Sequence, residues 1–128
     1  MGRQQPHTRG QSLVELALLL PVLMWVAAGV VDFGRVYYYD ITAINAARAG
    51  VRVAADPRNS DGLVQSAAQA DASPTALTVT VSPPYPRSSG DTATVTVSYS
   101  FALVTPLVAL LFPGGQLTVS RSASMVVF

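Results

Sequence analysis

The chain has no cysteine and no lysine, and its single histidine is His7, close to the N-terminus. These absences exclude Ser-His-Asp and Cys-His nucleophiles, a Schiff-base lysine, and zinc sites built from histidine or cysteine. Without cysteine, no disulfide framework indicates an oxidising compartment. The six aspartates are spread singly along the chain, at Asp32, Asp40, Asp56, Asp61, Asp71 and Asp91. We therefore expect a protein that is not an enzyme and that has no catalytic residue, no metal site and no cofactor.

Charged residues are scarce as well: they make up 12% of the chain, and the formal net charge is +1. The arginines form no cluster of the size that a nucleic-acid interface needs, so we expect no nucleic-acid partner. Half of the residues are hydrophobic, and the excess lies near the N-terminus. In a chain of 128 residues, this leaves room for one modest domain beside a membrane helix.

A long apolar run near the N-terminus predicts a membrane-spanning helix. Residues 16–31 carry no charge, and apolar residues extend the run to about 13–33. A helix needs about 20 mainly apolar residues to cross a hydrocarbon core of about 30 Å, with membrane lipid as its partner. Because Arg3 and Arg9 precede the run, the positive-inside rule places the N-terminus in the cytoplasm and the rest of the chain beyond the membrane.

Glu15 is a carboxylate at the edge of this apolar run. Ser12 and Glu15 have the spacing of a capping box, which predicts a helix that starts at Gln11 or Ser12. Glu15 can simply lie at the level of the lipid headgroups, where water solvates it. Alternatively, if the chain is cut after Gly10, the new α-amino group of Gln11 lies one helical turn from Glu15 and can pair with its carboxylate, in the same chain or in a neighbour. The spacing leaves both interpretations open.

The helix is expected to continue past the membrane. Pro21 lacks an N–H and so predicts a kink inside the membrane-spanning part. Beyond Asp32 and Arg35 no helix breaker interrupts the pattern. Apolar residues recur there at helical spacing: Tyr37, Ile41, Ile44, Ala47, Val51 and Ala55. The sequence thus predicts one helix from about Ser12 to Ala55, roughly 65 Å long, whose second half carries an apolar stripe for packing.

The remaining sequence predicts a second helix over about residues 61–72 and strands at 77–82, 92–101 and 116–128. The apolar face of the second helix is weak and consists of Leu63, Val64, Ala67 and Ala70. Arg121 falls in the inward phase of the third strand, which indicates either a bulge or an open end of that face. The predicted fold is α+β: a long N-terminal helix, a short second helix, and a small three-stranded antiparallel sheet packed on the long helix.

An apolar segment, residues 103–115, joins the second and third predicted strands. Pro106 and Pro113 bound its most apolar part, which is too short to span a bilayer. We favour a buried core turn for this segment. The alternative is an exposed patch for the membrane surface or for another subunit.

The N-terminal half of the chain resembles the TadE-like proteins, which are minor pseudopilins of tight-adherence (Flp-type) pilus and secretion systems. The resemblance lies in RGQSLVELALLLPVLMWVAAGVVDFGRVYY and in INAARAGVRVAA, within about the first 55 residues. The family's glycine before the cleavage point is similar to Gly10, and its glutamate five positions further on is similar to Glu15. Its other motifs resemble Leu20 and Pro21, the exit Asp32 to Arg35, and the segment Ala46 to Arg52.

This resemblance implies cleavage between Gly10 and Gln11 by a prepilin peptidase, and a role for Glu15 in subunit assembly. It implies a single-pass protein of the cytoplasmic membrane that acts in pilus assembly, with a possible place in a cell-surface pilus. The implied partners are other pilus or pseudopilin subunits and inner-membrane assembly proteins. The expected organisation is a cytoplasmic leader (1–10), a transmembrane and assembly helix (11–34) and an extracytoplasmic α+β domain (35–128). The leader differs from the family in its low charge.

Two other interpretations are compatible with the apolar run. The chain can be a single-pass anchored domain that has no assembly role and keeps Met1. It can also be a secreted protein, because Val26-Ala27-Ala28 before Gly29 loosely fits a signal-peptidase site. The N-terminal residue of the mature protein separates the three interpretations: Gln11 for the pseudopilin, Met1 for the anchored domain and Gly29 for the secreted protein.

Overall fold

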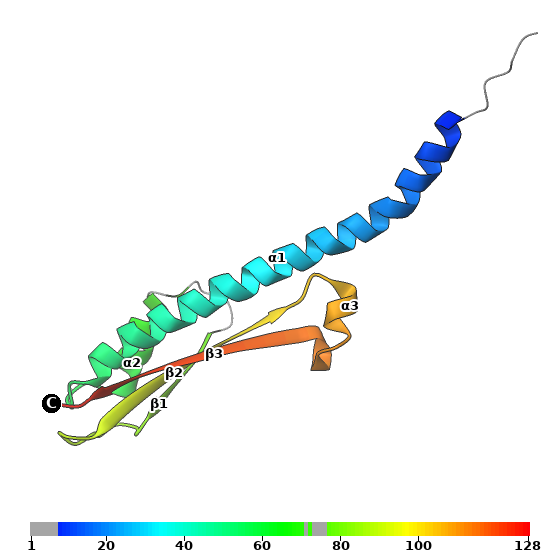
Figure 1. The fold of residues 1–128 in the computed structure, drawn as a ribbon. Coiled ribbons are helices and arrows are strands. Elements are labelled where there is room, and N and C mark those ends of the chain that lie inside the picture. Colours follow the sequence, from blue (N-terminus) through cyan, green and yellow to red (C-terminus); the bar gives the residue numbers. More distant parts are fainter. Residues whose placement is uncertain (1–7, 71, 73–76) are drawn as a thin grey trace, which may run out of the picture.

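The computed structural model describes residues 8–70, 72 and 77–128, and its fold is the predicted α+β arrangement. The elements are α1 (Thr8–Ala54), α2 (Asp61–Ala70), β1 (Leu77–Ser82), β2 (Thr92–Ala102), α3 (Pro106–Ala109), the 3-10 turn η1 (Pro113–Gly115) and β3 (Gln116–Val126). Figure 1 shows that the C-terminal half of α1 lies along the sheet, whereas the N-terminal half extends far beyond it. The domain is therefore built around one end of a single long helix.

Helix α1 starts earlier than the sequence predicts. It begins at Thr8, so the predicted start at Gln11 or Ser12 with a capping box is wrong: Ser12 and Glu15 both lie inside the helix. The helix ends at Ala54, as predicted within one residue. It continues through Pro21 without a break, and Figure 1 shows a curve, not a sharp bend, in its blue N-terminal half.

The three strands form an antiparallel sheet in the order β1-β2-β3. Alternate side chains of β2 are buried, as predicted: Ala93, Val95, Val97, Tyr99 and Phe101. The register between β2 and β3 runs unbroken from Thr92↔Val126 to Ala102↔Gln116, so β3 has no bulge. Arg121 therefore lies at an open part of the face, where its guanidinium pairs with the Asp40 carboxylate of α1 at 2.7 Å.

Small residues let α1 lie close to the sheet. Its buried positions in the half that lies along the sheet are Ala43, Ala46, Ala47, Gly50, Val51 and Ala54. A Cβ on Gly50 would lie 3.1 Å from Val95 Cγ1 and 3.3 Å from Ala68 Cβ, so a larger side chain would push α1 away from both β2 and α2. The apolar stripe predicted for this part of α1 is wrong at its N-terminal end, where Tyr37 and Ile41 are exposed. The packed face instead passes through Tyr39, whose ring stacks on that of Tyr99.

Helix α2 packs against α1 and β1 through fewer residues than the sequence predicts. Val64 and Ala68 are fully buried, but Leu63 is 54% exposed and Ala70 is exposed too. The helix is one half-turn shorter than expected, ending at Ala70. The two buried residues lie four apart, which gives α2 a single narrow contact stripe.

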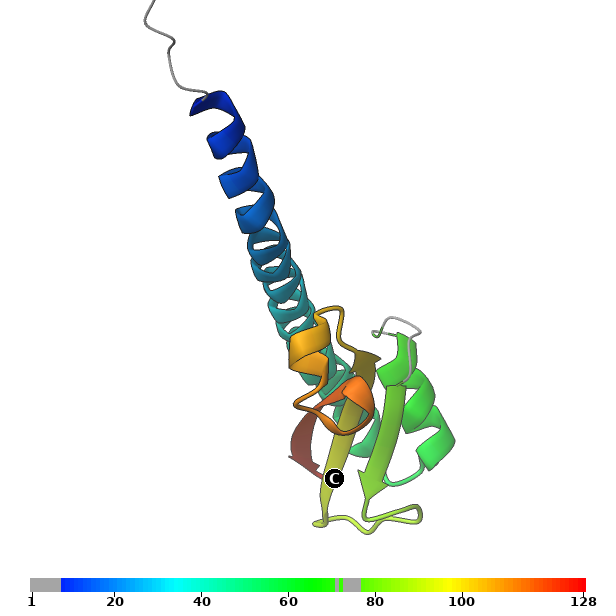
Figure 2. The same ribbon diagram turned by 90° about the vertical axis from the view of Figure 1, so that its right-hand side faces the viewer.

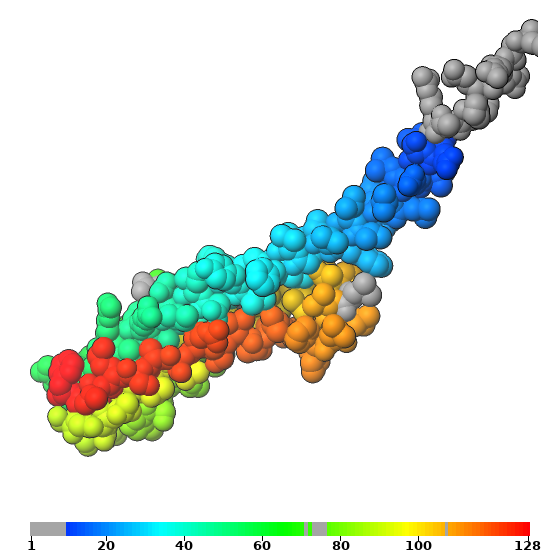
Figure 3. Space-filling view, in the orientation of Figure 1, coloured from blue at the N-terminus to red at the C-terminus, as the bar shows by residue number. Residues whose placement is uncertain are grey.

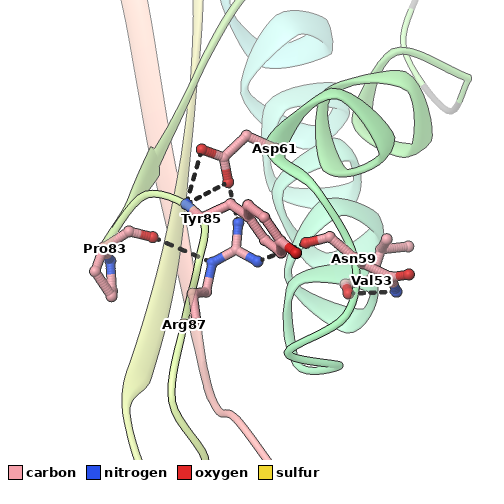
Figure 4. A network of polar contacts seen from close by, with 6 residues as sticks. All are labelled: Val53, Asn59, Asp61, Pro83, Tyr85 and Arg87. Carbon is pink, nitrogen blue, oxygen red and sulfur yellow. Dashed lines mark hydrogen bonds and ion pairs between the residues drawn. The ribbon is translucent and has the colours of Figure 1, made fainter.

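A buried arginine ties α2 to the loop between β1 and β2 (Figure 4). The Arg87 guanidinium donates hydrogen bonds to the carbonyls of Pro83 and Asn59, both at 3.1 Å, and to the Asp61 carboxylate. Asp61 also accepts hydrogen bonds from the Tyr85 amide at 3.1 and 3.2 Å. Because the Arg87 side chain is 0% exposed, these contacts are what compensate its charge for the loss of water.

Candidate membrane and assembly site

The N-terminal half of α1 presents an apolar surface that no other element of the described chain covers. Between Leu13 and Val31 its large apolar side chains are 48–72% exposed. The helix is long and apolar enough to cross a membrane, in agreement with the sequence prediction of one spanning segment. An exposed apolar surface of this size is typical of a segment that contacts a membrane or another protein.

The predicted processing and assembly residues lie on one side of this helix. A shallow hollow near its start is lined by Gly10, Gln11, Val14, Glu15 and Leu18. Gln11 and Glu15 therefore share a face, as their spacing predicts, and the Glu15 side chain is exposed. Because the helix begins at Thr8, the peptide bond between Gly10 and Gln11 is itself helical.

Where α1 leaves the apolar run, two of its side chains hold the chain segment that follows β2. The buried Asp32 carboxylate accepts hydrogen bonds from the Val104 amide at 2.9 and 3.0 Å and from the Thr105 amide at 2.8 Å. The Arg35 guanidinium donates to the Ala102 carbonyl at 3.0 Å. We call these five residues the exit cluster.

The exit cluster gives a structural role to the Asp32 to Arg35 motif. Arg35 also lies 3.8 Å from the Asp32 carboxylate and 5.1 Å from the centre of the Phe101 ring. The sequence shows the two charges three residues apart but does not indicate their partners. Those partners are backbone groups far along the chain, and backbone groups leave no signal in a sequence.

The segment 103–115 is not the buried core turn that we favour from sequence. Leu110 and Leu111 are 82% and 80% exposed, and Val104 is 55% exposed. The segment forms α3 and η1, two short turns that reverse the chain between β2 and β3. The segment stays outside the core because α1 and α2 already cover the apolar face of the sheet and leave no room there. The alternative, an exposed apolar patch, is the one that the structure supports.

Two further features of the domain surface are open. A groove between α1 and β3 is lined by Phe33, Val36, Tyr37 and Asp40 from the helix and by residues 117–121 from the strand. On another side of α1, Arg48 and Arg52 are exposed beside Asn45. Ala46 and Gly50 of the same segment point into the core, so this part of α1 has a packed side and a charged side.

The hydrogen bonds to Asp32 give a first prediction. In Asp32→Ala, amide hydrogen exchange at Val104 and Thr105 should rise by about 10-fold or more, because a hydrogen bond to a charged group stabilises the closed state by roughly 1.5–3 kcal/mol. Asp40→Ala, which removes a partly exposed ion pair on the same helix, should leave these two amides unchanged. Unchanged exchange in Asp32→Ala, measured on the full chain in detergent micelles, would contradict this role of the exit cluster.

Comparison with known proteins agrees with the resemblance drawn from the residues. Residues 10–52 match the family model described as TadE-like protein. No curated protein and no solved structure matches the chain. The matched range begins at Gly10, includes the exit motif, and ends at Arg52, before the sheet begins.

Proposed function

Taking the match of residues 10–52 to the TadE-like family as the premise, we propose that this chain is a minor pseudopilin-like membrane protein that takes part in assembling a tight-adherence (Flp-type) pilus or a related secretion apparatus. It is not an enzyme. Its N-terminus lies in the cytoplasm, α1 crosses the cytoplasmic membrane, and residues 35–128 lie outside. The observation that carries the proposal is the uncovered apolar half of α1, with Gly10, Gln11 and Glu15 together at its start.

A prepilin peptidase is the first proposed partner. It cuts between Gly10 and Gln11, a bond that must leave the helix to be cut. Glycine inside a helix is less stable than alanine by roughly 0.5–1 kcal/mol. Gly10 therefore eases local unwinding at the bond that is cut, and no neighbouring atom lies where its Cβ would be.

Cleavage creates a positive charge near Glu15, the α-amino group of Gln11, which the precursor does not have. The α-amino group of Gln11 is mostly protonated at neutral pH, since such groups have pKa values of roughly 7.7–8.0. A carboxylate in a membrane helix costs a few kcal/mol, about 2.5–3.5 kcal/mol at the helix centre and less near its ends. A cation within one helical turn, from the same chain or a neighbouring subunit, offsets this cost. The charge pair therefore stabilises the processed subunit relative to the precursor. Where the cation comes from a neighbouring subunit, the pair also stabilises the contact between the two subunits.

The domain outside the membrane is proposed to contact other pilus or pseudopilin subunits and inner-membrane assembly proteins. The exit cluster fixes this domain on α1 at the point where the helix leaves the apolar run. Because the domain is fixed to α1, it presents the same surfaces to neighbouring subunits whenever α1 is inserted in the membrane.

The alternatives receive less support. A secreted protein cut before Gly29 would lose more than half of the apolar run, but α1 continues without interruption through Gly29 into the core of the domain. An anchored domain without an assembly role leaves Glu15 and the hollow around it without a purpose. It remains the runner-up, and it differs from the proposal in its mature N-terminus.

N-terminal sequencing tests the proposal. Protein purified from membranes of cells with an active prepilin peptidase should begin at Gln11. In Gly10→Val, the precursor should accumulate and begin at Met1, because the glycine that precedes the proposed cleavage point is replaced by a larger, branched side chain. Gly29→Ala is the matched control: it also changes an open glycine of α1 and should be processed normally. A wild-type protein that begins at Met1 in such cells would overturn the proposal.

A further inference from the structure

The segment between β2 and β3 presents apolar side chains at the end of the domain from which the membrane half of α1 emerges. Figure 1 shows α3 beside the light-blue part of α1, and Figure 2, seen from the N-terminal side, shows the orange segment in front of the sheet. The space-filling view in Figure 3 places the orange atoms directly below the blue helix. At the tip of this segment Leu110 and Leu111 are exposed by 82% and 80%.

The exit cluster sets the level of this segment relative to the proposed bilayer. Residues 13–33 rise about 31 Å at 1.5 Å per residue, close to the hydrocarbon thickness of about 30 Å. Asp32 therefore lies at the outer boundary of the hydrocarbon. Because Val104 and Thr105 are hydrogen-bonded to Asp32, the segment that begins there is held at the same boundary.

The segment meets the two requirements for entering lipid. It has no charge, and residues 92–120 contain no charged side chain at all. Its backbone is also largely satisfied, which matters because an unpaired N–H in lipid costs several kcal/mol. Pro106 and Pro113 have no N–H, and Asp32 takes those of Val104 and Thr105. The amides that donate to carbonyls inside the segment are those of Leu103, Ala109, Leu110, Leu111, Phe112 and Gly115.

We propose that the tip of this segment, Leu110 and Leu111, inserts into the outer leaflet of the bilayer and forms a second membrane contact beside α1. The occupant of the patch is lipid, because the patch continues the exposed apolar surface of the spanning helix and is fixed at its boundary. This inference rests on the membrane location given under the proposed function. With two contacts, the tilt of the domain relative to the membrane plane is restricted.

The chain has no cysteine, so single labels can test the proposal. The full chain is placed in vesicles of phosphatidylethanolamine and phosphatidylglycerol, with an environment-sensitive fluorophore on Leu110→Cys or Leu111→Cys. Lipids with a nitroxide near the headgroup should quench most of the fluorescence of both labels. Leu63→Cys is the matched control, an exposed leucine on α2 whose label should keep its fluorescence. All three side chains are exposed, so the substitutions leave the core intact.

A label on Val22→Cys, in the middle of the apolar run, separates this proposal from the location on which it rests. Quenching at Val22 by deeply placed nitroxides, without quenching at Leu110 and Leu111, would overturn the second contact and leave the membrane helix standing. No quenching at Val22 would overturn both. An apolar shift of the Leu110 label without quenching by lipid would show that another copy of the chain covers the patch, and this would also overturn the proposal.

Discussion

Glu15→Gln is expected to abolish pilus assembly while the processed protein still accumulates in the membrane. Glutamine keeps the size of the side chain and its hydrogen-bonding capacity but loses the charge. The substituted helix therefore inserts at least as easily, since a carboxylate in lipid costs free energy that an amide does not. What it loses is the proposed attraction to the α-amino group that cleavage would give Gln11, a residue on the same face of α1. The measurements are surface pili on cells and the amount of protein in the membrane fraction.

Val14→Ala is the matched control for this experiment. Val14 lines the same hollow and is 62% exposed, so the substitution changes apolar contact near Glu15 without changing charge. It should assemble nearly as well as the wild type. Normal assembly of Glu15→Gln would remove the charge-pairing mechanism, whereas loss of the protein from the membrane would show that Glu15 acts in insertion instead.

Arg87→Ala is expected to destabilise the α+β domain more than any other single charge substitution. The side chain is fully buried, and its removal leaves the carbonyls of Pro83 and Asn59 without their donor and the Asp61 carboxylate with only the Tyr85 amide (Figure 4). Leaving a buried polar group without its hydrogen-bond partner costs about 1–3 kcal/mol for each group. The melting temperature of the full chain in detergent, followed by near-ultraviolet circular dichroism, should fall by more than about 10 °C.

Arg58→Ala is the control for Arg87, because it removes an arginine–aspartate pair at the surface. Hydrogen bonds from Arg58 lower the pKa of the Asp56 carboxyl, and the two side chains lie 3.0 Å apart. However, the Arg58 side chain is 87% exposed, and pairs in water contribute little to stability. The melting temperature of Arg58→Ala should stay close to that of the wild type. Equal melting temperatures for the two variants would show that the loop around Arg87 is not part of the cooperative unit.

The helices and strands whose apolar residues recur at regular spacing were predictable from sequence. The alternation in residues 92–101 predicted which side chains of β2 are buried, and the helical spacing beyond Arg35 predicted that α1 extends into the domain. The detailed face of α1 was missed because alanine and glycine pack more tightly than the larger Tyr37 and Ile41, which remain exposed. A hydrophobicity pattern weights large side chains and overlooks small ones.

Polar contacts between distant segments were not predictable. The sequence shows Asp32 and Arg35 as two charges near a membrane boundary, but nothing in it points to the amides of Val104 and Thr105. Arg87 lies in a loop rich in proline and serine, where an arginine is usually exposed. Likewise, the apolar character of residues 103–115 suggested burial, and only the packing of α1 and α2 on the sheet shows that the core is already full.

Helix α1 is one continuous helix through its exposed apolar half and through the core of the domain. No hinge among its described residues absorbs motion between the two halves, because the segment from Gly10 to Ala54 is helical throughout. Force applied to one end is therefore transmitted to the other. Each step of one residue along a helix corresponds to a rise of about 1.5 Å and a turn of about 100°. A translation or rotation applied to the N-terminal end of α1 therefore moves the sheet together with the helix.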